Sequence, residues 1–175
     1  MSHIKLLLLL ASLSCLSLHC KKEESEINKL PPATSYGAGT FGCLINGKAW
    51  PPRTPWIEVN YHDGILFIHS FIDNPKDPFV KDGVTLRTNR IHKAGEYFIN
   101  YKNYQDSWCS MIYKEKAYSS SSTSNQTVDN YFYYNITRLD SINRIVSGTF
   151  SFALFDAFGT SSVRVSDGRF DLYYY

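Results

Sequence analysis

This chain has no large excess of charge of either sign, few histidines and no recognisable catalytic motif. Its 18 basic and 16 acidic residues nearly cancel, whereas a protein that binds nucleic acid needs a clustered basic surface. The sequence contains no Gly-x-Ser-x-Gly nucleophile elbow, no His-Glu-x-x-His zinc motif and no phosphate-binding glycine loop. Beyond residue 19 the histidines are His62, His69 and His92. We therefore expect a protein that is not an enzyme, binds no nucleic acid and carries no metal or cofactor.

Long apolar runs are also missing, apart from one at the start of the chain. Lys5 is followed by five leucines and then by small or apolar residues as far as Leu18, whereas a transmembrane helix needs about 20 apolar residues. A basic residue followed by a short apolar stretch is typical of a secretory signal. We predict a signal peptide over residues 1–19; the alternative is a buried N-terminal helix.

Cysteine is rare, with Cys15, Cys20, Cys43 and Cys109 as the four examples. A secretory signal that ends at a cysteine resembles the signal of a bacterial lipoprotein, in which the thiol is diacylated and the chain is cleaved just before it. The upstream residues fit this pattern slightly better at Cys15. The downstream residues favour Cys20, because the charged run begins at once with Lys21, and removing Cys15 leaves an even pair. We predict lipidation at Cys20, so that the partner of the N-terminus is a membrane.

The charged residues after Cys20 also resemble a sorting signal. Lys22-Glu23-Glu24 resembles the lysine-then-two-acids signal that sends Bacteroidota lipoproteins to the outer leaflet of the outer membrane. The resemblance implies an outer-membrane protein exposed at the cell surface; the alternative is the periplasmic face. Residues 20–38 combine charge, a Pro-Pro pair and glycine without an apolar period, and we predict that they form a flexible tether.

From residue 39 to 175 the pattern changes to short alternating runs separated by turn dipeptides, which indicates a single antiparallel β domain. The clearest unit is residues 55–72, where Asp63-Gly64 suits a type I′ hairpin turn. That turn would pair Trp56 with Phe71 and Glu58 with His69. It would also leave one apolar face and one mixed face on the hairpin.

About nine or ten strands can be counted, and no segment shows a convincing helical period. The fold class is therefore all-β, either an antiparallel β-sandwich or a flattened up-and-down barrel; the sequence leaves both open. Residues 114–127 are predicted to form a polar loop. Asp167-Gly168 is predicted to turn the chain between two strands, with Asp171 facing outward in the last one.

Both ends of the β domain resemble a known family. The segments TFGCLINGKAWPP, ITRLDSINRIVSGTFSFALFD and VSDGRFDLYYY are similar to a family of uncharacterised Bacteroidota lipoproteins. Its members show an Asn-Gly-Lys-x-Trp opening, a Ser-Gly-Thr-Phe strand and a closing Asp-Gly-Arg-Phe-Asp strand. The resemblance implies a cell-envelope location and an all-β fold, and it implies no reaction.

Exposed aromatic residues on strands are the candidate binding site, since such surfaces can stack on sugar rings or dock a partner. The candidate ligand face consists of Trp56, Glu58, Phe67, His69 and Phe71 on the hairpin, with Tyr131 and Tyr133 from a later strand. The bland alternative is that these are ordinary strand-forming residues. Cys43 and Cys109 form either a disulfide or two separate buried thiols.

These patterns lead to three hypotheses about function. The first is a non-enzymatic, lipid-anchored lipoprotein whose β domain binds a ligand or partner, with a glycan among the candidates. The second is a structural accessory subunit of an outer-membrane complex. The third is a hydrolase without a recognisable motif.

Overall fold

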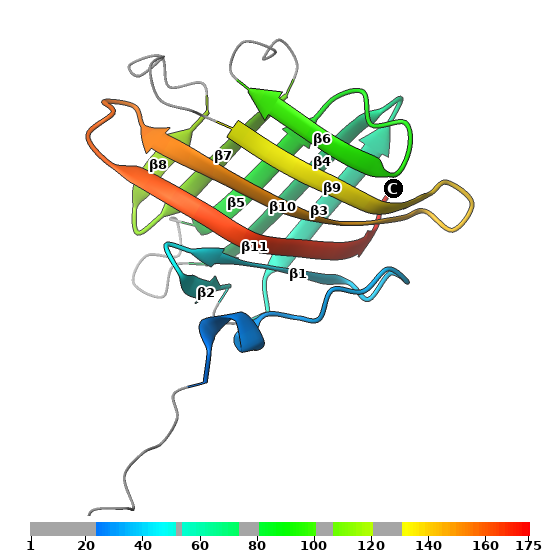
Figure 1. Cartoon of the computed structure of the whole chain (residues 1–175), viewed down its shortest axis with the longest axis horizontal. Coiled ribbons are helices and arrows are strands. Elements are labelled where there is room, and N and C mark those ends of the chain that lie inside the picture. Colours follow the sequence, from blue (N-terminus) through cyan, green and yellow to red (C-terminus); the bar gives the residue numbers. More distant parts are fainter. Residues whose placement is uncertain (1–23, 52–53, 74–80, 101–106, 121–130) are drawn as a thin grey trace, which may run out of the picture.

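The structure, a computed structural model, describes residues 24–51, 54–73, 81–100, 107–120 and 131–175. Over these residues its regular structure consists of strands and one short 3₁₀ helix, η1 (Glu26–Lys29) (Figure 1). In chain order the strands are β1 (Thr40–Ile45), β2 (Lys48–Trp50), β3 (Trp56–His62), β4 (Ile65–Asp73), β5 (Lys81–Thr88), β6 (Gly95–Asn100), β7 (Trp108–Tyr113), β8 (Lys116–Ser119), β9 (Tyr131–Asp140), β10 (Ile145–Asp156) and β11 (Ser162–Tyr173). The predicted all-β fold is confirmed.

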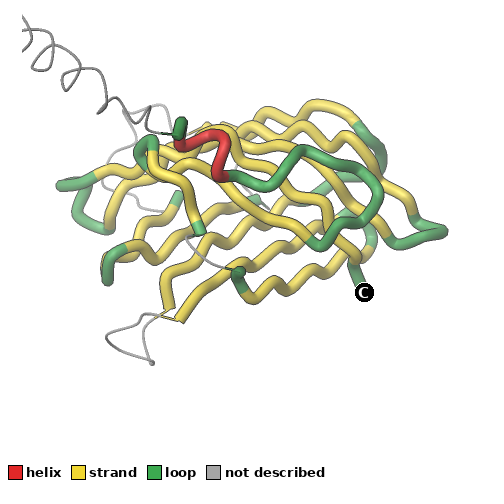
Figure 2. The backbone as a smooth tube through the Cα atoms, turned by 90° about the horizontal axis from the view of Figure 1, so that it is seen from below, coloured by secondary structure: helices red, strands yellow, loops and turns green. Residues whose placement is uncertain are grey.

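The strands of this part of the chain form one antiparallel sheet, in the order β2-β1-β11-β10-β8-β7-β5-β4-β3. One edge of β10 has two partners, because β9 pairs along Ile145–Phe152 and β8 pairs at Phe155 and Asp156; β9 also pairs with β6. At this branch the sheet curls over on itself, so that β6, β9, β10 and β11 cover β3, β4, β5 and β7 (Figures 1 and 2). The fold is thus a single curled sheet with two facing layers.

The predicted hairpin is confirmed residue by residue. Asp63 and Gly64 have φ of +49° and +79°, which are the left-handed values that a type I′ turn requires. The resulting register pairs Trp56 with Phe71 and Glu58 with His69. Because side chains alternate along a strand, this register fixes which hairpin residues face the core and which face outward.

The core lies between the two layers and is rich in aromatic rings. Phe132, Phe150 and Phe152 contribute from β9 and β10, and Ile68 and Leu86 from β4 and β5; each is at most 2% exposed. The Phe152 ring centroid lies 6.0 Å from that of Phe150 and 6.3 Å from that of Phe132. Burial of each such side chain stabilises the fold by about 1.5–3 kcal/mol.

Asp167-Gly168, which we predicted as a turn between strands, is instead a β-bulge inside β11. Where β10 advances two residues from Phe150 to Phe152, β11 advances three from Val165 to Gly168. Asp167 takes a φ of +52°, and a Cβ on Gly168 would lie 2.6 Å from the Phe150 ring. The prediction was wrong because a bulge and a turn share the same Asp-Gly signature.

The predicted loop over residues 114–127 is also partly wrong. Lys116–Ser119 is strand β8, which pairs with β7 and with the end of β10. The turn before it places Lys114 and Glu115 at φ of +50° and +66°, where glycine or asparagine is the usual choice. Residues 121–127 lie outside the described residues.

Residues 24–38, predicted as part of a flexible tether, are packed against the sheet. The Ala49 N–H donates to Glu26 (2.8 Å), and Leu30 is buried. Arg169 Nη1 donates to the Pro31 carbonyl (3.1 Å). Figure 2 shows this segment running along the outside of the strands. The tether prediction is therefore wrong for these residues, and residues 20–23 lie outside the described part of the chain.

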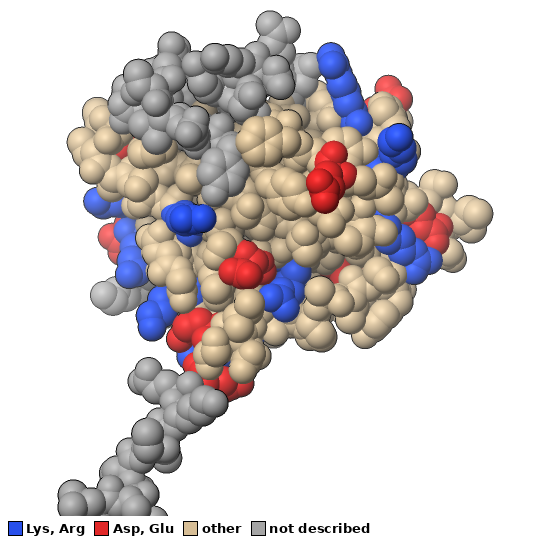
Figure 3. Space-filling model, viewed as in Figure 1, with Lys and Arg blue, Asp and Glu red and all other residues tan. Residues whose placement is uncertain are grey.

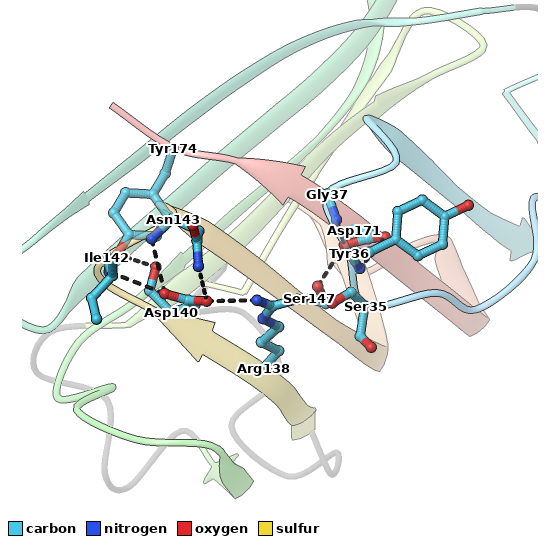
Figure 4. A network of polar contacts seen from close by, with 10 residues as sticks. All are labelled: Ser35, Tyr36, Gly37, Arg138, Asp140, Ile142, Asn143, Ser147, Asp171 and Tyr174. Carbon is cyan, nitrogen blue, oxygen red and sulfur yellow. Dashed lines mark hydrogen bonds and ion pairs between the residues drawn. The ribbon is translucent and has the colours of Figure 1, made fainter.

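The main attachment of the N-terminal segment is Asp171, which the sequence analysis placed facing outward on β11. Its carboxylate points away from the core as expected, yet it is only 1% exposed because residues 34–38 cover it. It accepts a hydrogen bond from the Thr34 hydroxyl (2.7 Å). The Gly37 N–H (2.8 Å) and the Ser147 hydroxyl (2.6 Å) also donate to it (Figure 4). The N–H groups of residues 36 and 38 also donate to it, at 3.1 and 3.0 Å.

We expect Asp171→Asn to lower the free energy of unfolding by about 2–4 kcal/mol, because it replaces a buried acceptor oxygen by an amide that faces N–H donors. Ser147→Ala is the matched control: it removes one of the five hydrogen bonds and should cost only about 1 kcal/mol. Urea unfolding measures both. Amide exchange at residues 36–38 should accelerate in Asp171→Asn, and an equally protected segment would contradict its role as the attachment point.

The same carboxylate should make the segment acid-sensitive. Burial raises the pKa of Asp171, but the hydrogen bonds from Ser147, Thr34, Ala38 and Gly37 outweigh it and lower the pKa to about 2. The unfolded value is about 3.9. A folded pKa below the unfolded one means that the stabilisation is complete above about pH 4 and is lost as the pH falls towards 2. Asp171→Asn should flatten this part of the stability profile.

Candidate ligand-binding surface

The outward face of the β3–β4 hairpin carries five of the predicted ligand-face residues. Phe67, His69 and Phe71 alternate along β4 and form a row of rings, which we call the aromatic ladder. The His69 ring centroid lies 6.4 Å from that of Phe67 and 4.9 Å from that of Phe71. On β3, Glu58 lies opposite His69, and Trp56 lies opposite Phe71 and is 67% exposed. These side chains share one surface, as the hairpin register predicted, and their role as a ligand face stays a prediction.

The neighbouring strand β5 holds the ladder in place. His69 Nδ1 is 2.8 Å from the Thr85 hydroxyl, which orients the imidazole. Phe71 is paired with Gly83, where a Cβ would come within 3.0 Å of the Phe71 Cβ. Arg87 pairs with Phe67 on one side and with Trp108 of β7 on the other. The ladder is therefore a fixed surface with polar side chains on both flanks.

Tyr131 and Tyr133, the other two predicted ligand-face residues, do not join the ladder. Both belong to β9, which pairs with β6 and β10. The alternate β9 residues Phe132 and Tyr134 pack into the same core as Ile68 of β4. Tyr133 thus faces outward from the opposite layer, and the Tyr131 side chain lies outside what the structure describes. Two-residue alternation predicted the outward direction of Tyr133 and could not predict the layer.

The outward side of the layer formed by β9, β10 and β11 contains a hollow that the sequence analysis missed. Its volume is about 290 Å³, and it lies beside the β11 bulge. The side chains that line it are Tyr133, Thr149, Ser151, Asp167 and Arg169. Both signs of charge are scattered over this face, with uncharged surface between them (Figure 3). The Asp167-Gly168 dipeptide was the sequence feature that could have indicated the bulge beside this hollow. Because it was interpreted as a turn between strands, the hollow was not predicted.

Cys43 and Cys109 are free thiols, so the disulfide alternative is not what the structure shows. In the strand order, β1 and β7 are separated by β11, β10 and β8. Cys109 Sγ instead lies 2.9 Å from the Tyr134 hydroxyl. Burial raises the pKa of Cys109 to about 12, although the hydrogen bond to Tyr134 lowers it in part; burial also raises the pKa of Cys43. Thiols that stay protonated are poor nucleophiles.

The buried position of both thiols predicts their reactivity. In the native protein at pH 7–8, Cys43 and Cys109 should not react with a thiol reagent, whereas both should react once the chain is unfolded without a reductant. Mass spectrometry after alkylation counts the modified residues. A chain that gains no label at these positions in denaturant would contain the disulfide and would contradict the free-thiol arrangement.

Comparison of this chain with family models, curated proteins and solved structures found no match. Over the described residues, no helix is long and apolar enough to cross a membrane. Within the same part of the chain, no three His, Cys, Asp or Glu side chains are grouped so that they could hold a metal ion. Cys15 and Cys20 lie outside the described residues, so lipidation stays a prediction.

Proposed function

We propose that this protein is a non-enzymatic, lipid-anchored lipoprotein of the outer membrane, exposed at the cell surface, whose β domain binds a glycan through the aromatic ladder. The observation that carries the proposal is the row of three rings on β4, extended by the exposed Trp56 on β3. Partly exposed rings that are held in a row on a sheet surface are typical of a binding site rather than of a core.

A sugar chain matches this surface in shape and in chemistry. The ladder spans residues 67 to 71, about 13 Å at the rise of a β-strand, so it can meet more than one sugar unit. The rings offer flat apolar faces, and a pyranose ring has such faces too. Glu58 and Asn60 on β3 and Arg87 on β5 lie beside the rings and offer acceptors and donors for sugar hydroxyls.

The packed N-terminal segment limits how far the domain can move from its anchor. If Cys20 carries the lipid, four residue steps separate it from Glu24, the first described residue. Four fully extended steps reach about 14 Å. The lipid would thus hold the domain close to the membrane surface, where a tether free as far as residue 38 would allow several times that distance.

Metabolic labelling with a fatty-acid analogue tests the anchor. We expect label on the wild-type protein and on Cys15→Ala, and no label on Cys20→Ala, because the diacylated thiol is the one that remains after cleavage. Cys43→Ala is the control for loss of an unrelated thiol. Label that persists in Cys20→Ala and disappears in Cys15→Ala would move the anchor to Cys15.

Glycan-array binding tests the ladder. We expect the protein to bind a subset of glycans, and Trp56→Ala and Phe71→Ala each to weaken that binding about tenfold, which corresponds to about 1.4 kcal/mol for each ring. Phe158→Ala is the matched control, because Phe158 is an 84% exposed aromatic in the turn between β10 and β11. Glycan binding that is unchanged by both ladder variants would overturn the assignment of the site.

A structural accessory role is the second candidate function. The ladder lies on the outer side of a curled sheet, and such a surface also suits a protein partner. In that case the protein should co-purify from membranes with a defined envelope protein, and the complex should be lost in Trp56→Ala and Phe71→Ala. The array should then show no binding, which separates the two functions.

A further inference from the structure

We propose that the hollow beside the β11 bulge is a second binding site, which takes a single neutral sugar ring. The site belongs to the layer of β9, β10 and β11, opposite the layer that carries the aromatic ladder. The inference goes beyond the proposed function, because it concerns different residues on a different face and requires neither the lipid anchor nor the ladder.

The shape of the hollow follows from side-chain size along three neighbouring strands. At the hollow, the outward residues of β10 are Thr149 and Ser151, which are small and carry hydroxyls. Across the strand pairs, Ser151 lies opposite Tyr133 of β9, and Thr149 lies opposite Arg169 of β11. A floor of small residues between longer side chains leaves a space of about 290 Å³, with an aromatic wall on one side and a polar wall on the other.

The bulge places a second charged group at the polar wall. Val163 and Val165 face the core, so unbroken alternation along β11 would turn both Asp167 and Arg169 inward as well. The extra residue of the bulge turns them outward, to the hollow. Asp167 sits at φ of +52°, a left-handed conformation that aspartate tolerates better than most residues with a side chain. Gly168 is required because any Cβ would meet Phe150. Bulges of this kind commonly redirect a side chain next to a functional site.

Tyr133 and Arg169 are held in place by hydrogen bonds to other parts of the protein, and each keeps a group that a ligand can contact. Loss of hydration and the hydrogen bond to Glu96 raise the pKa of Tyr133, so the phenol is tied at its hydroxyl while its ring lines the hollow. Arg169 donates through Nη1 to the Pro31 carbonyl (3.1 Å) and through Nε to the Asp167 carbonyl (3.4 Å). Nη2 has no hydrogen bond to a described residue, so it can donate to a ligand.

The charges of the lining residues select the class of ligand. One carboxylate and one guanidinium line the hollow, so the ligand that fits carries no net charge. A ring with an apolar face would pack on Tyr133, and its hydroxyls would donate to Asp167 and accept from Arg169, Thr149 and Ser151. A neutral monosaccharide satisfies both requirements, whereas an apolar ligand would leave the charged groups of the wall without partners.

Saturation-transfer NMR on the full chain, as expressing cells process it, tests the site. The probes are the methyl glycosides of glucose, galactose, mannose and N-acetylglucosamine, each added alone. We expect transfer to at least one of them, with the ring protons on one face receiving most of it because that face packs on Tyr133. Absence of transfer to all four at tens of millimolar would overturn the proposal.

Variants locate the binding and separate this site from the ladder. Tyr133→Ala and Arg169→Gln should each weaken the binding about tenfold. Ser151→Gln should abolish the binding, because the longer side chain fills the hollow. Residue 151 faces outward and the variant keeps the Tyr133 ring, so the melting temperature should stay close to that of the wild type. Phe71→Ala and Phe158→Ala should leave the binding unchanged. Binding that is lost in Phe71→Ala and retained in Ser151→Gln would overturn this inference and support the ladder.

Discussion

The carboxylate of Asp171 connects segments that are distant in the sequence, namely the N-terminal segment, β10 and β11. It sits on β11, between β1 and β10 in the sheet, and takes hydrogen bonds from the N-terminal segment and from Ser147 on β10. A carboxylate with five donors is stable as a charge even when water is excluded. The segment that it holds in turn supplies the Pro31 carbonyl to Arg169. One buried charge thereby supports the β11 surface and holds residues 34–38 of the N-terminal segment against the sheet.

The sequence predicted those features that depend on local chemistry. The Asp63-Gly64 turn has few conformations open to it, so the register of β3 and β4, and with it the aromatic ladder, followed from the residue pattern. The layer to which Tyr133 belongs depends on how the whole sheet curls, and no local pattern contains that information. The packed N-terminal segment was missed for a different reason. Its contacts to Asp171 use backbone N–H groups of residues 36–38, which every non-proline residue possesses.

The bulge in β11 explains why the surface beside it was not predicted from the residue pattern, because one extra residue shifts the alternation of buried and exposed positions. Before it, Val163 and Val165 face the core, and after it Phe170 and Leu172 do, so the buried positions change from odd to even numbers. A strict two-residue alternation predicts two separate strands at such a change. The continuous strand keeps both halves in register with β10 and places polar side chains at the site of the change.

A second network beside Asp171 adds to the attachment of the N-terminal segment. Arg138 on β9 donates to the Ser35 carbonyl (2.6 Å) and to the Asp140 carboxylate (2.5 Å), and Asp140 also caps the β9–β10 turn at Asn143 (Figure 4). Mechanical tension applied at the N-terminus would reach the sheet through these contacts and through Asp171. It would load the edge strand β2 first, through Glu26 and Ala49, and then β11 and β9, which lie inside the sheet. Release of the segment therefore requires several hydrogen bonds to break, which would suit the lipid-anchored domain that we propose.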